Sequence, residues 1–524
     1  MIKINCESGV DASLLWRRAF VDAVSKNEKE IFFARGTYHF YENGATLKHC
    51  FVSNNDESVK KIAFYLNGVK DLKICGDDAR FIFHGRISPF VLEECFNVRI
   101  EGISIDFADR FAYETKVIES DGNSVLMQID GKFCVENGKF RVFDDGLDNM
   151  TGKLQFAAFD PVCGDVLMNG SYHVINQNLP PANGNMLRVP MSLRHGHTDF
   201  LLRHQARHAP AVVIDRSKDT VLCNLNIYHA EGMGVIGQNS ENILLDRVNV
   251  IPADGQHLAV TDDATHFSEC YGHIELRNCV LHHTLDDAVN IHGMYRRMRK
   301  IGNDVLLEAC HFQQFGLWDG RDGDVIELLK CDTLEPYAYV KVKHFMLGTR
   351  QLYCLELADS LPPEFEDRDV ARIMRPADCR VVISNCDLAN NRNRGILVTG
   401  TEKVLIENNR IHSPGYGIYL SGDANYWYES GPDKYVEICG NTFDNCCYAA
   451  ENTCPICVDP IIPRKKEGFF YHGKLNVHHN IFKTAQQTPV LQAHSLAELD
   501  FADNILPGHI ANAVDMQDGK SRVR

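Results

Sequence analysis

The sequence predicts an all-β fold, a right-handed parallel β-helix, from three observations. One template of apolar residues recurs along the chain, a second strand-like segment follows it in several repeats, and an Asp-Asp motif occurs twice in phase. Short β-rich repeats bounded by turn residues are typical of a solenoid whose coils stack on one another. The length of 524 residues is too great for one ordinary compact domain, which fits an elongated repeat protein or several domains.

The recurring template has apolar residues at its positions 1, 3, 6 and 8, as in residues 98–105. Several steps between copies are 23 or 24 residues, about one coil of a parallel β-helix. Position 6 is often Asn or Cys, and stacked Asn side chains at a tight bend can hydrogen-bond from coil to coil. Further copies of the template begin at Thr220, Ile243, Ile274, Val381, Val404, Val436, Leu475 and Leu499.

A second strand is visible in several coils. Residues 394–400 share the glycine-terminated pattern of residues 287–293, which places Asp287 at the position of Arg394. Both are polar residues at the start of a strand, so we expect this row of positions to line one exposed face of the solenoid.

The repeat lapses twice, and both gaps contain alternating strands with Gly and Asp turns. We therefore expect two inserted small antiparallel β-barrel domains, the second of which should wall one side of the site. Asp11 followed by apolar residues at helical spacing over 12–24 predicts a short N-terminal capping helix. The predicted domains are an N-terminal β-helix part with its cap (1–106), a first inserted barrel (107–215), β-helix coils carrying the active site (216–294), a second inserted barrel (295–378) and C-terminal β-helix coils (379–524).

Composition restricts the partners and the compartment. The formal net charge of −16 argues against nucleic acid or an anionic membrane, and no apolar run is long enough to span a membrane. The N-terminus has no apolar signal core, so we expect a cytoplasmic protein, or an exported one if a signal has been removed. The 19 cysteines are then reduced thiols. Cys454 and Cys457 form one CxxC motif, read as apolar filling of a coil rather than as a redox or metal site.

The stretch on which the functional prediction depends is residues 285–293, Leu-Asp-Asp-Ala-Val-Asn-Ile-His-Gly. A near copy, Thr-Asp-Asp-Ala-Thr-His-Phe, lies 24 residues earlier at 261–267. One Asp-Asp pair alone would be read as a turn or helix cap. Two copies in phase stack on neighbouring coils, which brings Asp263, Asp286 and Asp287 into one patch. Carboxyl groups at close range tend to keep one member protonated.

An inverting glycosidase needs a carboxylic acid and a carboxylate about 6.5–9.5 Å apart. We place Asp286 in the turn before the strand, from which it reaches the glycosidic oxygen as the acid. Asp263 and Asp287, one coil apart, then hold the attacking water together, because stacked strands lie about 4.8 Å apart.

Five further residues are predicted to bind sugar hydroxyls, because they lie on or near the same rows. The residues are His292, Asn290, His266, His257 and Glu231. Ordinary polar outer-face positions are the alternative for Asn290 and His292. Arg203 and Arg207, where the first insertion returns to the solenoid, are read as a solvated surface.

The two Asp motifs, with Cys-Tyr-Gly-His-Ile at 270–274 between them, resemble the α-1,3-galactosidases of glycoside hydrolase family 110. The order of β-helix and insertions is similar as well, over nearly the whole chain. The resemblance implies an exo-acting, inverting enzyme that removes terminal α-1,3-linked galactose, as on blood group B or linear Galα1-3Gal structures. It also implies Asp286 as general acid with Asp263 and Asp287 as the base pair. More distantly, the trio is similar to that of the β-helical polygalacturonases.

The expected partner is a galactose-terminated oligosaccharide or glycan, with no cofactor and no metal, and a homodimer is consistent with the resemblance. Another glycoside hydrolase on this fold is the first alternative. A polysaccharide lyase acting on a galactose- or uronate-containing polymer is the second. Lyases of that kind usually need Ca²⁺ and a basic residue, and neither Asp motif contains Lys or Arg. A non-catalytic glycan-binding β-helix is the third.

Overall fold

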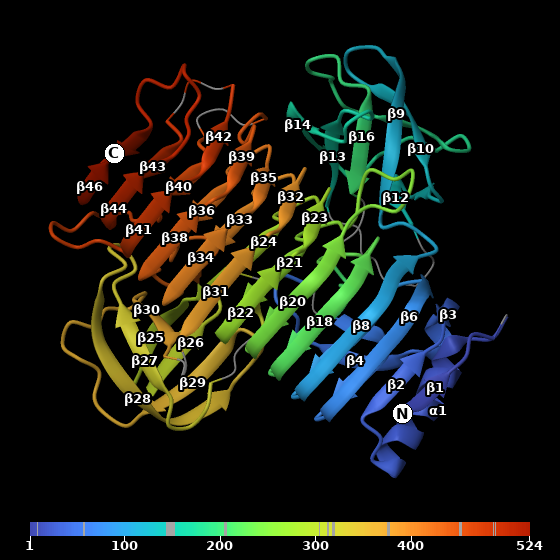
Figure 1. Ribbon diagram of the computed structural model, residues 1–524, viewed down its shortest axis with the longest axis horizontal. Helices are drawn as coiled ribbons and strands as arrows, with labels where there is room; N and C mark the ends of the chain where they lie inside the picture. Colours follow the sequence, from blue (N-terminus) through green and yellow to red (C-terminus); the bar gives the residue numbers. More distant parts are fainter. Residues whose placement is uncertain are drawn as a thin grey trace.

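The structure is a computed structural model, and its strands stack into a parallel β-helix with two insertions, as predicted. It describes residues 1–7, 9–55, 58–142, 152–203, 207–302, 304–311, 314–316, 320–374, 378–449, 453–485, 487 and 489–524. The coils lie side by side from α1 to β46, and the two insertions leave on opposite edges of the stack (Figure 1). No helix among these residues is long and apolar enough to cross a membrane.

The larger sheet of the β-helix has 19 strands in the described residues. They are β1 (Ile2–Ile4), β2 (Glu30–Phe33), β3 (Gly36–Tyr41), β6 (Lys70–His84), β8 (Phe96–Phe107), β18 (Lys218–Ile227), β20 (Glu241–Val250), β22 (Tyr271–Arg277), β23 (Val280–His282), β31 (Cys379–Ser384), β32 (Asp387–Ala389), β34 (Lys403–Glu407), β35 (Arg410–His412), β38 (Tyr435–Cys439), β39 (Thr442–Asp444), β41 (His472–His478), β42 (Ile481–Lys483), β44 (Leu496–Ala502) and β46 (Lys520–Val523).

The second sheet carries the site. Its strands are β4 (Thr46–Cys50), β5 (Ser58–Asn67), β7 (Ile87–Glu93), β17 (Val212–Asp215), β19 (Val235–Gln238), β21 (Thr265–Ser268), β24 (Val289–Met294), β33 (Ile396–Val398), β36 (Ile418–Leu420), β37 (Glu429–Ser430), β40 (Ile456–Val458), β43 (Leu491–Ala493) and β45 (Val514–Met516). One continuous apolar core runs between the two sheets, and the apolar template positions Val98, Ile100, Ile103 and Ile105 all lie in it.

The predicted asparagine ladder is confirmed at the bends of the last coils. The Asn409 and Asn441 backbone amides donate to the side-chain oxygens of Asn441 and Asn480, each over 2.9 Å. The Asn480 amide donates in the same way to Asn504 over 2.9 Å. The side chains of Asn409, Asn441 and Asn480 are buried. The ladder therefore gives hydrogen-bond partners to backbone N–H groups that the bend would otherwise leave unpaired.

The predicted N-terminal helix is present as α1 (Ala12–Lys26). The Asp11 side chain caps it by accepting from the Ser13 amide over 2.9 Å. Trp16 on its buried face lies 4.5 Å from Phe64, ring centroid to ring centroid. The helix therefore covers the core at the N-terminal end of the stack, where the first coil has no neighbour. A short 3-10 turn, η1 (Glu42–Gly44), follows β3.

The first insertion is an open six-stranded antiparallel sheet in its described part, a half-barrel where the sequence predicted a barrel. One face buries its own core, and the other packs on the β-helix through Ala157, Leu201, Leu258 and Leu285. The strands of the sheet are β9 (Ala112–Ser120), β10 (Val125–Asp130), β13 (Lys153–Phe159), β14 (Val166–Ile175), β15 (Met186–Val189) and β16 (Asp199–Arg203), with the hairpin β11 (Cys134–Glu136) and β12 (Lys139–Arg141). The sheet stays open because its edge strands, β14 and β15, do not pair with each other in the described residues.

The second insertion is a closed antiparallel barrel with its own core, as predicted. Its strands are β25 (Arg296–Ile301), β26 (Asp304–Glu308), β27 (Val325–Leu329), β28 (Pro336–Leu347), β29 (Leu352–Leu357) and β30 (Val370–Ile373).

The CxxC cysteines lie inside the coil that contains β40. Cys454 and Cys457 are 0% and 5% exposed, and burial holds the pKa of the Cys454 thiol well above its usual value. A buried, protonated thiol behaves as a small apolar side chain, which agrees with the filling role predicted for the pair.

Candidate active site

The two Asp-Asp motifs lie directly before two neighbouring strands, β21 and β24. These strands pair in parallel with Thr265 opposite Val289, so residues 24 apart in the sequence stack on adjacent coils. The next strand, β33, pairs with β24 so that Val289 lies opposite Ile396, and the same spacing places Arg394 beside Asp287. The stacking predicted from both alignments is therefore present.

Asp263, Asp286 and Asp287 form one cluster. One carboxylate oxygen from each lies within 4.8 Å of the other two. The Asp287 backbone amide donates to Asp263 Oδ1 over 2.9 Å, which ties the two coils together at this point. The Asp287 side chain is 0% exposed, whereas that of Asp286 is 20% exposed and faces the cavity described below.

Guanidinium groups surround the cluster. Arg394 Nε donates to Asp287 Oδ1 over 2.8 Å, and Arg207 Nη2 lies 3.6 Å from Asp286 Oδ2. Asn393 Nδ2 donates to the other Asp286 oxygen over 3.1 Å. Arg392 Nε binds the Leu285 carbonyl oxygen over 2.6 Å and so lies in the same shell. Three like charges in one patch are tolerable because this shell compensates them.

The protein separates the protonation states of the three carboxyl groups. Burial and the charge of Asp286 raise the pKa of Asp263 well above its usual range. Burial also raises the pKa of Asp287 well above that range, against the opposing effect of Arg394. Burial acts in the same direction on Asp286, but nearby guanidinium groups outweigh it and lower the pKa of that carboxyl. These effects favour the proton on Asp263 or Asp287 and the ionised form on Asp286 in the free site.

The cluster opens into a polar cavity of about 370 Å³. Its wall combines segments far apart in the sequence, including Gln155 and Arg203 of the first insertion and Trp427 of a C-terminal loop. Two buried oxygens on this wall, Asp287 Oδ2 and Asn290 Oδ1, have no hydrogen-bond partner among the described residues. Buried polar atoms without partners are costly, so a ligand rich in hydroxyl groups fits this cavity.

Of the five predicted sugar-binding residues, only Asn290 lines this cavity. His266 and His292 are buried behind the carboxylates, at 0% and 3% exposure. The pattern of alternation placed them on the outer face, but this face of the coil is itself covered by Asn54, whose amide contacts His266.

Glu231 and His257 also lie away from the described cavity wall, so the structure does not bring them to the three carboxylates. Glu231 is 0% exposed and pairs with Arg86 over 2.9 Å. His257 Nδ1 contacts Glu114 over 2.9 Å, so this ring holds the first insertion against the solenoid. Glu231 lies near the row of the carboxylates and His257 in the preceding loop, and their side chains contact Arg86 and Glu114 instead.

The sequence analysis did not predict several residues of the cavity wall, and it assigned others to the solvated surface. Arg203 and Arg207, read as a solvated surface, are mostly buried and both bind Asp262, over 2.9 and 2.6 Å. Glu429 and Trp427 come from a loop without repeat periodicity, so the sequence carried no signal for them. The loop is held by Asp423, whose carboxylate accepts from the amides of residues 425–428.

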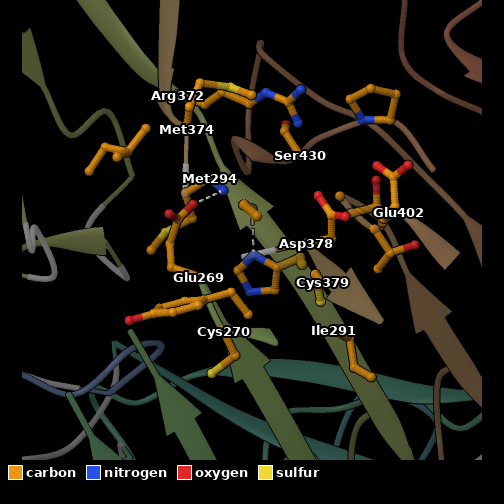
Figure 2. Close-up of a pocket in the computed structure, with 18 of the residues that line it drawn as sticks. Glu269, Cys270, Ile291, Met294, Arg372, Met374, Asp378, Cys379, Glu402 and Ser430 are labelled. Atoms are coloured by element: carbon orange, nitrogen blue, oxygen red, sulfur yellow. Dashed lines mark hydrogen bonds between the residues drawn. The ribbon is translucent and has the colours of Figure 1, made fainter. Parts of the chain in front are cut away.

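The second barrel does not wall this cavity, contrary to expectation, in the part of it that the structure describes. It supports the loop from behind instead. Gln314 Nε2 donates to the Trp427 carbonyl oxygen over 2.9 Å, and the His311 ring lies 4.8 Å from the Trp427 ring. Its residues Arg372 and Met374 line a smaller, separate cavity of about 130 Å³ (Figure 2), whose wall also includes His292.

The three carboxylates have the spacing of a cation site. Oxygen-only ligands suit Ca²⁺ or Mg²⁺. Arg394 and Arg207 already place positive charge at this cluster, and the absence of a metal requirement remains our prediction.

Comparison with known proteins first defines the class. A solved structure, the A-module of the mannuronan C-5 epimerase AlgE4 of Azotobacter vinelandii, aligns with 98% of this chain and 96% of that chain, at 10% identity and a TM-score of 0.45. A family profile described as "Right handed beta helix region" matches residues 364–517. This match and the coil stacking described above define a right-handed β-helix protein.

Relatives then define the family. The chain is 30% identical over 512 residues to Alpha-1,3-galactosidase A of Shewanella woodyi, covering 95% of this chain and 83% of that protein. It is 29% identical over 499 residues to Alpha-1,3-galactosidase B of Bacteroides thetaiotaomicron, covering 91% and 80%. The chain belongs to the α-1,3-galactosidase family.

Proposed function

We propose that the protein is an exo-acting, inverting α-1,3-galactosidase that hydrolyses terminal α-1,3-linked galactose on blood group B or linear Galα1-3Gal structures. One observation carries the proposal: Asp263, Asp286 and Asp287 meet at a polar cavity in a chain of this family. Hydrolysis of a glycosidic bond needs one carboxylic acid and one carboxylate. A cluster whose members differ in pKa supplies both.

Asp286 is the general acid in this proposal, because its side chain is the most exposed of the three carboxylates toward the cavity. The electrostatics of the free site alone support the reverse assignment, since its pKa is lowered. A bound sugar that displaces Arg207 from Asp286 removes part of this effect. The acid then gains its proton in the complex, and activity on natural linkages falls as the pH rises.

Asp263 and Asp287 activate the attacking water. A base works best when its pKa lies near the operating pH, and both pKa values are raised toward that range. Asp287 Oδ2 has no partner among the described residues and can accept the water. The two carboxyl groups belong to adjacent coils, so one water can contact both.

The spacing of the cluster is shorter than the sequence led us to expect. Its nearest oxygens lie within 4.8 Å, below the roughly 6.5–9.5 Å common in inverting enzymes. A retaining enzyme would use a carboxylate as nucleophile at about 5–5.5 Å. We propose inversion because Asp263 and Asp287 lie on adjacent coils, where one water could contact both, and the anomer of the first product decides the question.

The direct test is release of galactose from Galα1-3Gal, with the α-1,4 and α-1,6 isomers as controls. Wild-type protein is expected to release galactose from the α-1,3 isomer, and the Asp263→Asn, Asp286→Asn and Asp287→Asn variants to be nearly inactive. Turnover of all three linkages at equal rates would contradict the linkage assignment.

A polysaccharide lyase is the second candidate, because the fold brings Arg207 and Arg394 to the carboxylates although neither Asp motif contains a basic residue. Positive groups beside carboxylates also suit a uronate substrate. A lyase releases an unsaturated sugar that absorbs ultraviolet light, and many need Ca²⁺. Incubation with acidic polysaccharides, with and without a chelator, distinguishes it from the hydrolase.

A further inference from the structure

The outer face of the larger sheet carries a second group of metal-type ligands, whereas the aspartate cluster lies beside the second sheet. On β38, Glu437 and Cys439 are separated by the buried residue Ile438, so both side chains point out of the coil. The next coil contributes β41, which pairs with β38 in parallel and places His478 directly opposite Cys439 (Figure 1). The repeat thus brings a carboxylate, a thiol and an imidazole to one place.

The three side chains are close enough to share one ion. One possible ligand atom from each lies within 4.8 Å of the other two. His478 Nε2 lies 3.2 Å from Glu437 Oε1. Two such atoms bound to a tetrahedral zinc ion at about 2.0–2.1 Å each lie about 3.3 Å apart, so this pair already has the required separation. The His478 and Glu437 side chains are 32% and 28% exposed, so an ion can enter from solvent.

Cys439 differs from the cysteines that fill the coils. Cys279 and Cys386 are buried, and their thiols donate to backbone carbonyl oxygens over 3.3 Å. Cys439 is partly exposed on the outer row, and its thiol donates no hydrogen bond to another residue in the described part of the chain. On the preceding coil, Glu407 of β34 lies directly opposite it. A thiol in this position adds little apolar packing, and its placement beside two carboxylates favours a ligand role.

We propose that Glu437, Cys439 and His478 bind one Zn²⁺ ion between the coils of β38 and β41. Thiolate and imidazole ligands favour zinc over Ca²⁺ and Mg²⁺, which prefer oxygen ligands. The thiol proton of Cys439 passes to solvent as the sulfur–zinc bond forms. Three protein ligands leave the fourth tetrahedral position to a water molecule. None of the three residues belongs to the described wall of the sugar cavity, so the ion has no part in the proposed hydrolysis.

Neighbouring side chains already orient the ligands. Tyr435 Oη donates to Glu437 Oε2 over 3.2 Å, which leaves Oε1 toward His478. The other ring nitrogen of His478, Nδ1, lies 2.9 Å from His479 Nδ1. With its proton on Nε2, neutral His478 donates to Glu437. With its proton on Nδ1, it donates to His479 and leaves Nε2 free for a metal, as outer contacts do in known zinc sites.

Cobalt(II) tests the site directly, because a thiolate bound to Co²⁺ gives a near-ultraviolet charge-transfer band. The reduced wild-type protein should bind one Co²⁺ per chain with this band, and Zn²⁺ should displace it, whereas an excess of Mg²⁺ or Ca²⁺ should not. Cys439→Ser should lose the band. Cys134→Ser, which changes an exposed cysteine on β11, should keep it. Absence of the band from the wild type would overturn the proposal without recourse to any variant.

Affinities for Zn²⁺ separate ligands from their neighbours. Calorimetry should show that Cys439→Ser and His478→Ala each weaken binding by more than about 10²-fold, the largest loss typical of an outer contact. His479→Ala removes only such a contact and should weaken binding about 10-fold. Equal affinity in the wild type and Cys439→Ser would contradict the assignment.

Thermal unfolding shows whether the ion joins the coils. With a chelator present, Cys439→Ser and His478→Ala should unfold at the midpoint of the wild type, because both side chains lie on the outer face. Zn²⁺ should then raise the midpoint of the wild type and of Cys134→Ser but of neither ligand variant, since an ion that binds only the folded state stabilises it. A rise that persists in Cys439→Ser would place the ion elsewhere, such as at the aspartate cluster, and would overturn the proposed site.

Discussion

The backbone amide of Asp287 donates a hydrogen bond to Oδ1 of Asp263 across two adjacent coils, over 2.9 Å. One candidate catalytic carboxylate is thus fixed by the main chain that carries another. A parallel β-helix makes this arrangement available at low cost, because residues one coil apart stack in register. Side chains held by the main chain of rigid strands lose little freedom when a substrate binds, which favours catalysis.

The roles within the trio can be separated by the leaving group. Asp286→Asn should lose about 10³-fold in kcat/KM on Galα1-3Gal but much less on a dinitrophenyl α-galactoside, whose leaving group needs no proton. Asp263→Asn and Asp287→Asn should lose equally on both substrates. If the Asp263 or Asp287 variant instead loses much less activity on the dinitrophenyl α-galactoside than on Galα1-3Gal, that residue is the acid and Asp286 is the base.

Asp263 should make the folded protein less stable as the pH rises. Its pKa is raised above 3.8, so between that value and the folded pKa the folded state binds more protons than the unfolded state. The protonated carboxyl contributes its whole stabilisation below pH 3.8, and this contribution is lost as the pH rises from 3.8 through the raised pKa of the folded state. Asp263→Asn cannot ionise. Its thermal midpoint should match wild type near about pH 4 and exceed it by about 1–3 °C at about pH 7. An equal difference at both values would contradict the raised pKa.

Arg394 should matter more for stability than an exposed arginine on the same solenoid. Arg394→Ala leaves Asp287, which is 0% exposed, without its ion-pair partner, and loss of one partner of a buried pair costs about 3–5 kcal/mol. Arg410→Ala is the matched control, because this residue is 44% exposed and pairs with Asp387 and Asp444. Its loss should cost about 0–1 kcal/mol. Chemical denaturation measures both, and equal costs would mean that Arg394 does not stabilise the cluster.

Trp427 should bind the sugar next to the terminal galactose. It lines the cavity and is 43% exposed, so part of its side chain is accessible to a sugar ring. Trp427→Ala is expected to raise KM for Galα1-3Gal about 10-fold, equivalent to about 1.4 kcal/mol. KM for a small alkyl α-galactoside should change little. Phe96→Ala, 41% exposed on β8 and outside the described wall, is the control. Equal effects of the two variants would reject this role.

Much of the fold followed from the sequence because a solenoid repeats one local rule. The template at residues 98–105 fixes which side chains face the core, and Asn409 and its counterparts mark the bends. The closure of the first insertion did not follow. Whether a small antiparallel sheet closes depends on whether its two edge strands pair, here β14 and β15, and the alternation of residues within each strand does not predict that pairing.

The site was predictable where it depends on register and unpredictable where it depends on loops. The repeat alignment that stacked the three aspartates also placed Arg394 at the position of Asp287. Their ion pair could therefore have been predicted from the sequence. His266 and Glu231 lie on the correct rows but are covered by other segments. Trp427 and Glu429 reach the cavity on a loop whose backbone is held by Asp423. This loop lies outside the repeat pattern, so the sequence does not predict its course.

The central claim is inverting hydrolysis by the aspartate cluster, and NMR of the sugar first released from Galα1-3Gal tests it most directly. Wild-type protein should release β-galactose before mutarotation, and Asp286→Asn should release almost none. Initial α-galactose would contradict inversion and make one member of the closely spaced cluster a nucleophile. Absence of galactose from every α-linked substrate would contradict the hydrolytic function itself.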